Sequence, residues 1–120
     1  MEDETVEMIE WPKFLEIKYS GFVDEKTMFQ LVQVIKQESQ KRKNCHVLID
    51  LTGSIGNIDS STRFKIGFYL AEHLGSEFRL GVCADKARIN MIAKTVAETR
   101  GVNIFVHQEK SKVESWLLHA

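Results

Sequence analysis

The side chains best suited to chemistry lie in residues 48–61, LIDLTGSIGNIDSS, between an apolar segment and an expected helix. An acid and hydroxyl groups at the start of a helix can accept hydrogen bonds from the free N–H groups of the first turn. A serine in that position can instead be modified or contacted by a partner protein. The sequence leaves both interpretations open. The candidate partner-binding or phosphorylation residues are Asp50, Thr52, Asp59, Ser60 and Ser61.

A second polar group follows the next two apolar segments. Functional groups collect beyond the C-terminal ends of parallel strands, and we expect Asp85, Lys86 and His107 there as possible ligand-binding residues. Asp85 and His107 could form an acid–base pair, but their spacing does not distinguish them from solvated loop residues. The sequence has neither a G-x-S-x-G turn nor a glycine-rich phosphate-binding motif. We therefore predict no catalytic residues and a protein that is not an enzyme.

No metal or cofactor is expected either. The four histidines are scattered without the spacing of metal ligands. The two cysteines, Cys45 and Cys83, fall on separate expected strands toward opposite edges of the sheet. A disulfide requires a Cα separation of about 4.4–6.8 Å, so we predict that both thiols are free.

The bulk composition excludes several classes of partner. The 120 residues carry a net charge of −1, with 43% hydrophobic and 28% charged residues. That charge provides no long-range field for nucleic acid, and no apolar run approaches the ~20 residues that span a bilayer. The first ten residues, MEDETVEMIE, are acidic and do not resemble a signal peptide. A cytoplasmic protein without nucleic-acid binding or membrane insertion is expected.

The elements that must position these residues alternate along the chain. Residues 5–19 predict a β-hairpin with Pro12 in its turn. Strands at 46–51, 78–84 and 102–107 then alternate with helices from the cap Asp24 to Arg42 and at 60–74, 85–101 and 109–120. The order β-β-α-β-α-β-α-β-α predicts one α/β domain over residues 1–120. It has a single mixed, mostly parallel sheet with helices on both faces.

Helical spacing also predicts which side chains are buried. In the helix at 60–74 the apolar stripe comprises Phe64, Gly67, Phe68 and Ala71, and Gly81 within a strand indicates the close approach of a helix. We predict that seven side chains are buried: Met28, Leu31, Ile35, Phe68, Ile92, Val96 and Trp116. In the helix at 85–101, Ile89 is also expected to face inward.

Asp50-Leu51-Thr52 followed by Asp59-Ser60-Ser61 resembles a pattern of the STAS domains, the family of anti-sigma-factor antagonists. The segments FYLAEHL (68–74) and RGVNIFVHQEKSKVESWL (100–117) are similar to the SpoIIAA-like branch of small bacterial proteins, which is related to STAS and to the lipid-transfer CRAL-TRIO fold. The resemblance spans residues 14–117. In the antagonists the first serine after the aspartate is phosphorylated by a partner kinase, and the resemblance implies that role for Ser60.

Three functions follow from these observations. The first is a non-enzymatic regulatory module of STAS type, bound by a protein partner, a kinase or another regulatory protein, at Asp59-Ser60-Ser61. The second is a binder of a small apolar or lipid-like ligand, which would need a cavity. A small hydrolase that uses Asp50, Asp85 or His107 has the least support. Weak self-association is also expected, because an edge hairpin presents unpaired backbone groups.

Overall fold

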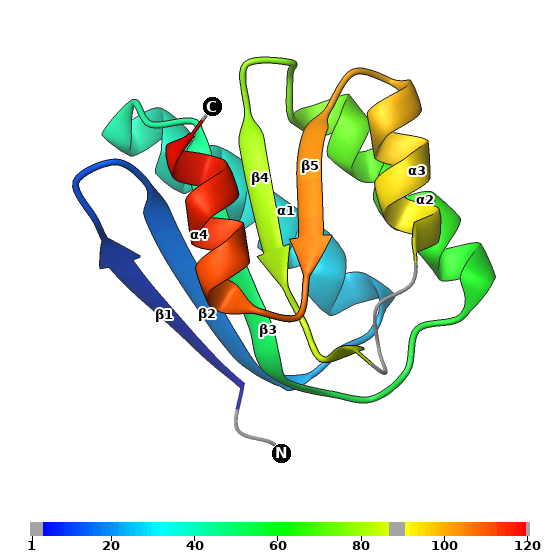
Figure 1. Ribbon diagram of the computed structural model, residues 1–120. Coiled ribbons are helices and arrows are strands. Elements are labelled where there is room, and N and C mark those ends of the chain that lie inside the picture. The colour runs from blue at the N-terminus through cyan, green and yellow to red at the C-terminus, as the bar shows by residue number, and fades with distance from the viewer. Residues whose placement is uncertain (1–3, 87–90, 120) are drawn as a thin grey trace.

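The computed structural model describes residues 4–86 and 91–119. Its sheet has five strands, β1 (Thr5–Glu10), β2 (Leu15–Phe22), β3 (His46–Ile55), β4 (Arg79–Cys83) and β5 (Asn103–His107). They lie side by side in chain order (Figure 1). β1 and β2 form the antiparallel hairpin, and the other neighbours are parallel. The predicted mixed, mostly parallel α/β sheet is confirmed.

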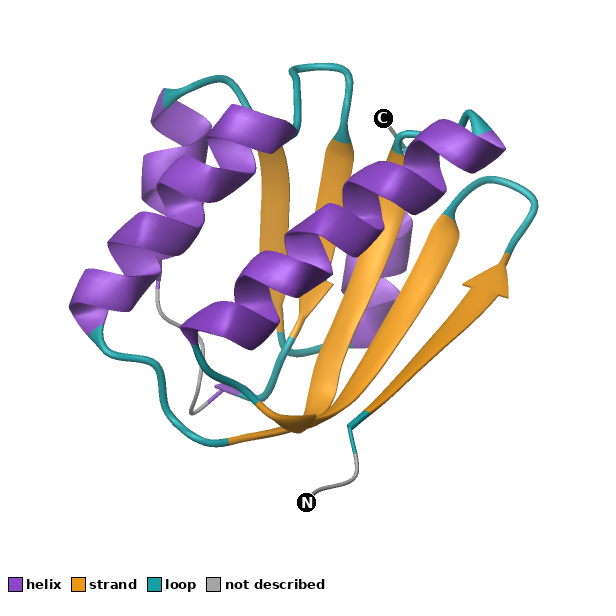
Figure 2. Ribbon diagram, turned by 180° about the vertical axis from the view of Figure 1, so that it is seen from behind, coloured by secondary structure: helices purple, strands orange, loops and turns teal. Residues whose placement is uncertain are grey.

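Helices cover both faces of this sheet, as predicted. α1 (Glu25–Arg42), α2 (Ser60–His73) and α3 (Met91–Thr99) lie on one face, and α4 (Lys110–Leu118) lies on the other (Figures 1 and 2). The larger core cluster joins Leu31, Ile35 and Ile66 to the first face, whereas Val113 and Leu117 pack with Leu48 on the second. Within the described ranges, no helix is long and apolar enough to cross a membrane.

α1 has the predicted bounds because its two ends are well defined. The carboxylate of Asp24 accepts a hydrogen bond from the Thr27 N–H at 2.8 Å, which satisfies a free donor of the first turn. At the other end Lys43 takes a left-handed conformation with φ 54°, and its N–H bonds to the carbonyl of Gln40. This left-handed residue ends the helix.

β3 is longer than the sequence predicted. Thr52–Ile55 were expected in a loop, but Gly53, Ser54 and Ile55 pair with Ser20–Phe22 after a register shift in β2. A polar segment with a glycine is typical of a loop, and only the neighbouring strand supplies the hydrogen bonds that extend it. The loop before α2 therefore begins near Gly56.

The buried face of α2 was predicted wrongly. Ile66, Gly67 and Leu70 face the core, while Phe64 and Phe68 are 49% and 45% exposed. Apolar residues occur all around this helix, so its periodicity does not select one face. Gly67 determines which face is buried, because a side chain there would place its Cβ 2.7 Å from the Cβ of Val96 on α3.

Of the other predicted core residues, Leu31, Ile35 and Val96 are buried as expected, whereas Met28 and Ile92 are only partly buried. Ile89 falls within residues 87–90 and therefore lies outside the described residues. The predicted start of its helix, near residue 85, adjoins the same segment. Trp116 is only half-buried, since it stacks on Phe105 at the surface of α4, with ring centroids 5.5 Å apart.

The contact between α4 and the sheet depends on Gly81. A Cβ at Gly81 would overlap the Val113 side chain, which confirms the predicted close approach of a helix. Val113 has a short branched side chain and is fully buried, so it cannot move aside easily.

We predict that Gly81→Ala lowers the free energy of unfolding by about 1–3 kcal/mol, the usual cost of overpacking a core. Val113→Ala in the same chain should remove the overlap. The double variant should therefore lose less stability than the sum of the two single variants, as measured by urea unfolding. Additive losses would show that Gly81 and Val113 are not in contact.

Candidate functional site

The start of α2 is the best-exposed part of the predicted site. Asp59 caps the helix, because its carboxylate accepts a hydrogen bond from the Thr62 N–H at 2.8 Å. The hydrogen bonds from Thr62 hold the pKa of Asp59 below its usual value. Ser60 and Ser61 are the first two residues of α2, and both are exposed. Asp59 therefore has the structural role of the cap, and neither serine is needed for it.

An exposed apolar stripe continues from Ser60 along the outer side of α2. Phe64 and Phe68 follow Ser60 at intervals of four residues, the spacing that places side chains on one face of a helix. Met91, exposed at the start of α3, lines a shallow hollow with Phe64. We call Ser60, Ser61, Phe64, Phe68 and Met91 the entrance surface. The prediction that Phe68 lies in the core is therefore wrong, and the apolar periodicity of this helix carries no signal that would have placed the ring on the surface.

The structure separates Asp50 and Thr52 from this surface. In β3, Ile49 and Leu51 belong to the core beneath α1 and α2. The side chain of Asp50 points to the opposite face, where it meets Lys110 of α4. The Thr52 N–H and hydroxyl both donate to Asp50 Oδ1, at 2.9 and 2.7 Å. The five predicted residues therefore form two groups on opposite faces of the sheet.

The second group includes two residues that the sequence analysis missed. Glu16 on β2 is only 1% exposed, and its carboxylate accepts hydrogen bonds from the Trp11 indole at 2.8 Å and from the Lys110 ammonium. Lys110 also donates to Asp50 Oδ2 at 3.4 Å. We call Glu16, Asp50 and Lys110 the buried charge network. Glu16 alternates with apolar residues in β2, a pattern that also fits a solvent-facing position, so no local signal marks it.

The network shifts the pKa values of Asp50 and Lys110. Burial by itself raises the pKa of Asp50, but hydrogen bonds from Thr52 and the charge of Lys110 outweigh burial and lower it. Burial likewise disfavours the charged form of Lys110, yet Glu16 and Asp50 outweigh it and raise that pKa. Both groups are held in their charged forms at neutral pH.

The remaining predicted residues do not form an acid–base site. Asp85 and Lys86 are exposed. The Nδ1 atom of His107 accepts a hydrogen bond from the Glu109 N–H at 2.9 Å, a contact that helps to turn the chain into α4. Across residues 4–86 and 91–119, no three His, Cys, Asp or Glu side chains are grouped to hold a metal ion.

Cys45 and Cys83 are free thiols, as predicted. Burial, followed by the charge of Asp50, raises the pKa of the Cys83 thiol, and its sulfur lies 3.5 Å from the Gln108 carbonyl. Burial also raises the pKa of Cys45. Neither cysteine has the lowered pKa of a reactive thiol.

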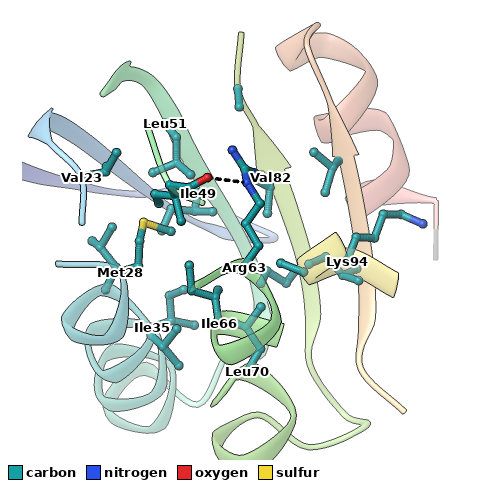
Figure 3. Close-up of a pocket in the computed structure, with 18 of the residues that line it drawn as sticks. Val23, Met28, Ile35, Ile49, Leu51, Arg63, Ile66, Leu70, Val82 and Lys94 are labelled. Atoms are coloured by element: carbon teal, nitrogen blue, oxygen red, sulfur yellow. Dashed lines mark hydrogen bonds between the residues drawn. The ribbon is translucent and has the colours of Figure 1, made fainter. Parts of the chain in front are cut away.

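An apolar cavity of about 150 Å³ lies between the sheet and helices α1, α2 and α3 (Figure 3). Its walls are aliphatic, with Met28, Ile49, Leu51, Ile66, Leu70 and Val82 among them. No local signal in the sequence predicts this cavity, because it depends on how the three helices pack across the sheet.

The arrangement of strands and helices defines a class of protein. No family model matches the sequence, and no curated protein matches it. Among solved structures, the chain is similar to an anti-sigma factor antagonist from Mycobacterium paratuberculosis. That match has a TM-score of 0.69, 19% identity, and 97% of this chain and 95% of that chain covered.

Two further solved structures agree. An uncharacterised protein with a SpoIIAA-like fold from Shewanella loihica has a TM-score of 0.60 and 15% identity over 98% of this chain and 95% of its own. The anti-sigma factor antagonist SpoIIAA in its unphosphorylated form has a TM-score of 0.53 and 11% identity over 98% of this chain and all of its own. The chain therefore has the SpoIIAA-like fold, which confirms the predicted resemblance at the level of the fold.

We predict that Asp59→Ala destabilises the protein at neutral pH, whereas Ser60→Ala changes the free energy of unfolding by no more than about 0.5 kcal/mol. Because the pKa of Asp59 is lowered in the folded state, its contribution is present above the ordinary aspartate value and is lost as the pH falls through the folded value. Thermal unfolding from pH 7 to pH 2 should show this loss. A loss of stability larger than about 0.5 kcal/mol from Ser60→Ala would show that Ser60 caps the helix.

Lys110→Met should lower the free energy of unfolding by about 2–3 kcal/mol at pH 7, since two buried carboxylates lose their cation. Lys110 is itself 34% exposed, which keeps this value at the lower end of the range for buried pairs. Lys112→Met, an exposed change on the same helix, is the matched control.

The pH dependence tests the same network. The lowered pKa of Asp50 gives stability above the ordinary aspartate value that is lost in acid. The raised pKa of Lys110 gives stability below the ordinary lysine value that is lost as the pH rises through the folded value. The deficit of Lys110→Met should therefore shrink at both extremes of pH, as followed by urea unfolding. A deficit independent of pH would mean that only packing was lost.

Proposed function

We propose that this protein is a non-enzymatic regulatory module that binds a partner protein through the entrance surface. The observation that carries the proposal is the alignment of exposed Ser60 with two exposed phenylalanines on one side of α2. Phenylalanine is costly to leave in water, and aromatic side chains are enriched at protein interfaces. Within the chain the Phe68 ring packs against the Arg100 guanidinium, 4.2 Å from its centroid, and Phe64 borders the hollow beside Met91. Both rings stay about half exposed, and partner binding would bury the rest of their surface.

The position of Ser60 supports regulation by phosphorylation. A phosphate at the first residue of a helix interacts favourably with the free N–H groups and the positive end of the helix dipole. It would also add charge beside Phe64, one turn further along the exposed stripe. Modification of Ser60 would therefore change the partner that this surface binds while leaving α2 intact.

The similar structures suggest the kind of partner. Two of them are anti-sigma factor antagonists, and one of these is described in its unphosphorylated form. By analogy with these proteins, we infer that the partner is a regulatory protein such as an anti-sigma factor, or a kinase that modifies Ser60. This inference rests on the shared fold.

Three other sequence-based predictions stand beside this proposal. The small hydrolase has less support, because Asp50 is committed to Thr52 and Lys110 and His107 accepts a hydrogen bond from Glu109. Weak self-association stays a prediction; β1 is the first strand of the sheet, so its outer edge could pair with a second copy. A cytoplasmic location also stays a prediction.

Phe64→Ser should abolish partner binding without unfolding the protein. The side chain is already half exposed, so we expect a change in stability of at most about 0.5 kcal/mol. Wild type, Phe64→Ser and Leu118→Ser would be used as baits in an extract of the source cells, with quantitative mass spectrometry. Leu118 is similarly exposed but belongs to α4 on the opposite face, which makes Leu118→Ser the matched control.

We expect to find a protein that wild type and Leu118→Ser both enrich from the extract. The amount recovered with Phe64→Ser should be lower by about tenfold or more. The affinity of that protein should then be measured with purified components, for wild type and for Ser60→Asp as a mimic of phosphorylation. A change in affinity for Ser60→Asp would support regulation by phosphorylation of Ser60, and equal affinity would refute it. Identical captured sets for Phe64→Ser and wild type would refute the entrance surface as a binding site.

A further inference from the structure

The apolar cavity lies where α2 is held away from the sheet. α2 has most of its backbone contacts with α1 and α3 rather than with the strands. Only side chains therefore bridge the distance to the sheet, and Ile66 and Leu70 from α2 and Ile49 and Val82 from the strands line the space between (Figure 3). Protein interiors are close-packed, and voids much larger than a water molecule are few. A space of this kind is a candidate ligand site.

The volume of the cavity sets the size of the ligand. An engineered apolar cavity of about 150 Å³ in another protein stays dry and binds benzene. The cavity here has a volume of about 150 Å³, and all but three of its described lining residues are apolar. It can therefore hold a molecule of about six carbon atoms.

The polar side chains of the lining already have partners within the chain. Among the described lining residues they are Ser54, Arg63 and Lys94. The Ser54 hydroxyl and the Arg63 Nε atom donate to main-chain carbonyls at 2.6 and 2.9 Å, and the Lys94 ammonium pairs with Glu98 at 2.9 Å. An apolar molecule can bind without breaking these interactions. A charged molecule would be placed mainly against hydrocarbon, where burial of a charge is far more costly, so the lining favours a neutral ligand.

The position of the cavity in the fold also suits a ligand. Its lining extends to the carboxyl ends of three parallel strands, with Ser54 near the end of β3, Ala84 directly after β4 and Val106 near the end of β5. In open α/β sheets, ligands bind at this edge. The cavity thus reaches the part of the sheet where a binding site is expected.

From its volume, lining and position we propose that this cavity binds a small neutral apolar molecule of about six carbons. The ring or chain of the ligand contacts Ile49, Ile66 and Leu70. The proposal is independent of the partner-binding function, because Ile66 and Leu70 lie on the inner side of α2, whereas Phe64 and Phe68 are exposed on its outer side.

Benzene and benzoate test the size and the charge of the ligand. Benzene has the proposed size and no charge, and benzoate adds a carboxylate to the same ring. Binding to the full chain would be followed by two-dimensional amide NMR titration and by the melting temperature, which rises when a ligand binds only the folded state. We expect saturable benzene binding with a Kd of about 0.1–1 mM and benzoate binding at least about tenfold weaker.

The location of the ligand is tested in wild type and in variants. In wild type, nuclear Overhauser effects should connect the benzene protons to the methyl groups of Ile49, Ile66 and Leu70. Val82→Phe adds a ring to the cavity wall and should weaken benzene binding by about tenfold or more. Leu118→Phe is the matched control, since it adds a ring at an exposed position on the opposite face of the sheet and should leave benzene binding unchanged. Amide spectra without ligand establish that each variant is folded.

Failure of benzene to bind wild type would show that the cavity is a packing void only. Overhauser effects to other methyl groups alone, or unchanged benzene binding by a folded Val82→Phe variant, would place the ligand outside this cavity. Benzoate affinity equal to or higher than that of benzene would overturn the neutral ligand. Phe64→Ser should bind benzene like wild type, so loss of partner binding and loss of ligand binding can be told apart.

Discussion

The ammonium of Lys110 lies between two buried carboxylates, and much of the structure depends on that arrangement. Glu16 belongs to the N-terminal hairpin, Asp50 to the central strand and Lys110 to the first turn of the last helix. Two carboxylates and one ammonium leave a net negative charge, and hydrogen bonds from Trp11 and Thr52 stabilise it. Because an unpaired buried charge is costly, the first turn of α4 has to bring the Lys110 side chain within reach of Glu16 and Asp50. The network thus joins the two ends of the chain.

This constraint also decides how the two faces of the sheet differ. Along β3, Leu48 and Asp50 point toward α4, and Ile49 and Leu51 point toward α1 and α2. The α4 face therefore contains the charges and is covered by one short helix. The other face is apolar and is covered by three helices (Figure 2), and the cavity lies beneath them. The charge network and the cavity are thus separated by the thickness of one sheet.

α2 borders both the cavity and the entrance surface. Its inner side, with Ile66 and Leu70, forms part of the cavity wall, and its outer side presents Phe64 and Phe68. Gly67 fixes this orientation, because only a residue without a side chain permits the close approach of α3. The similar solved structures are 11–19% identical to this chain. A fold is maintained by patterning and close contacts of this kind more than by particular residues, so the sites must be argued from this chain's own side chains.

The sequence by itself determined the elements whose signals are local. α1 follows from its cap at Asp24 and the spacing of Leu31, Val32 and Ile35, and the close approach at Gly81 follows from a glycine inside a strand. Capping by Asp59 was also predictable, because it depends on residues three apart. The outward orientation of Phe64 and Phe68, the extension of β3 and the buried charge network were not. Each depends on a partner distant in the chain, such as Val96, Ser20 or Lys110. Which face of an apolar helix is buried, and which polar strand residue is removed from solvent, is decided only by tertiary packing.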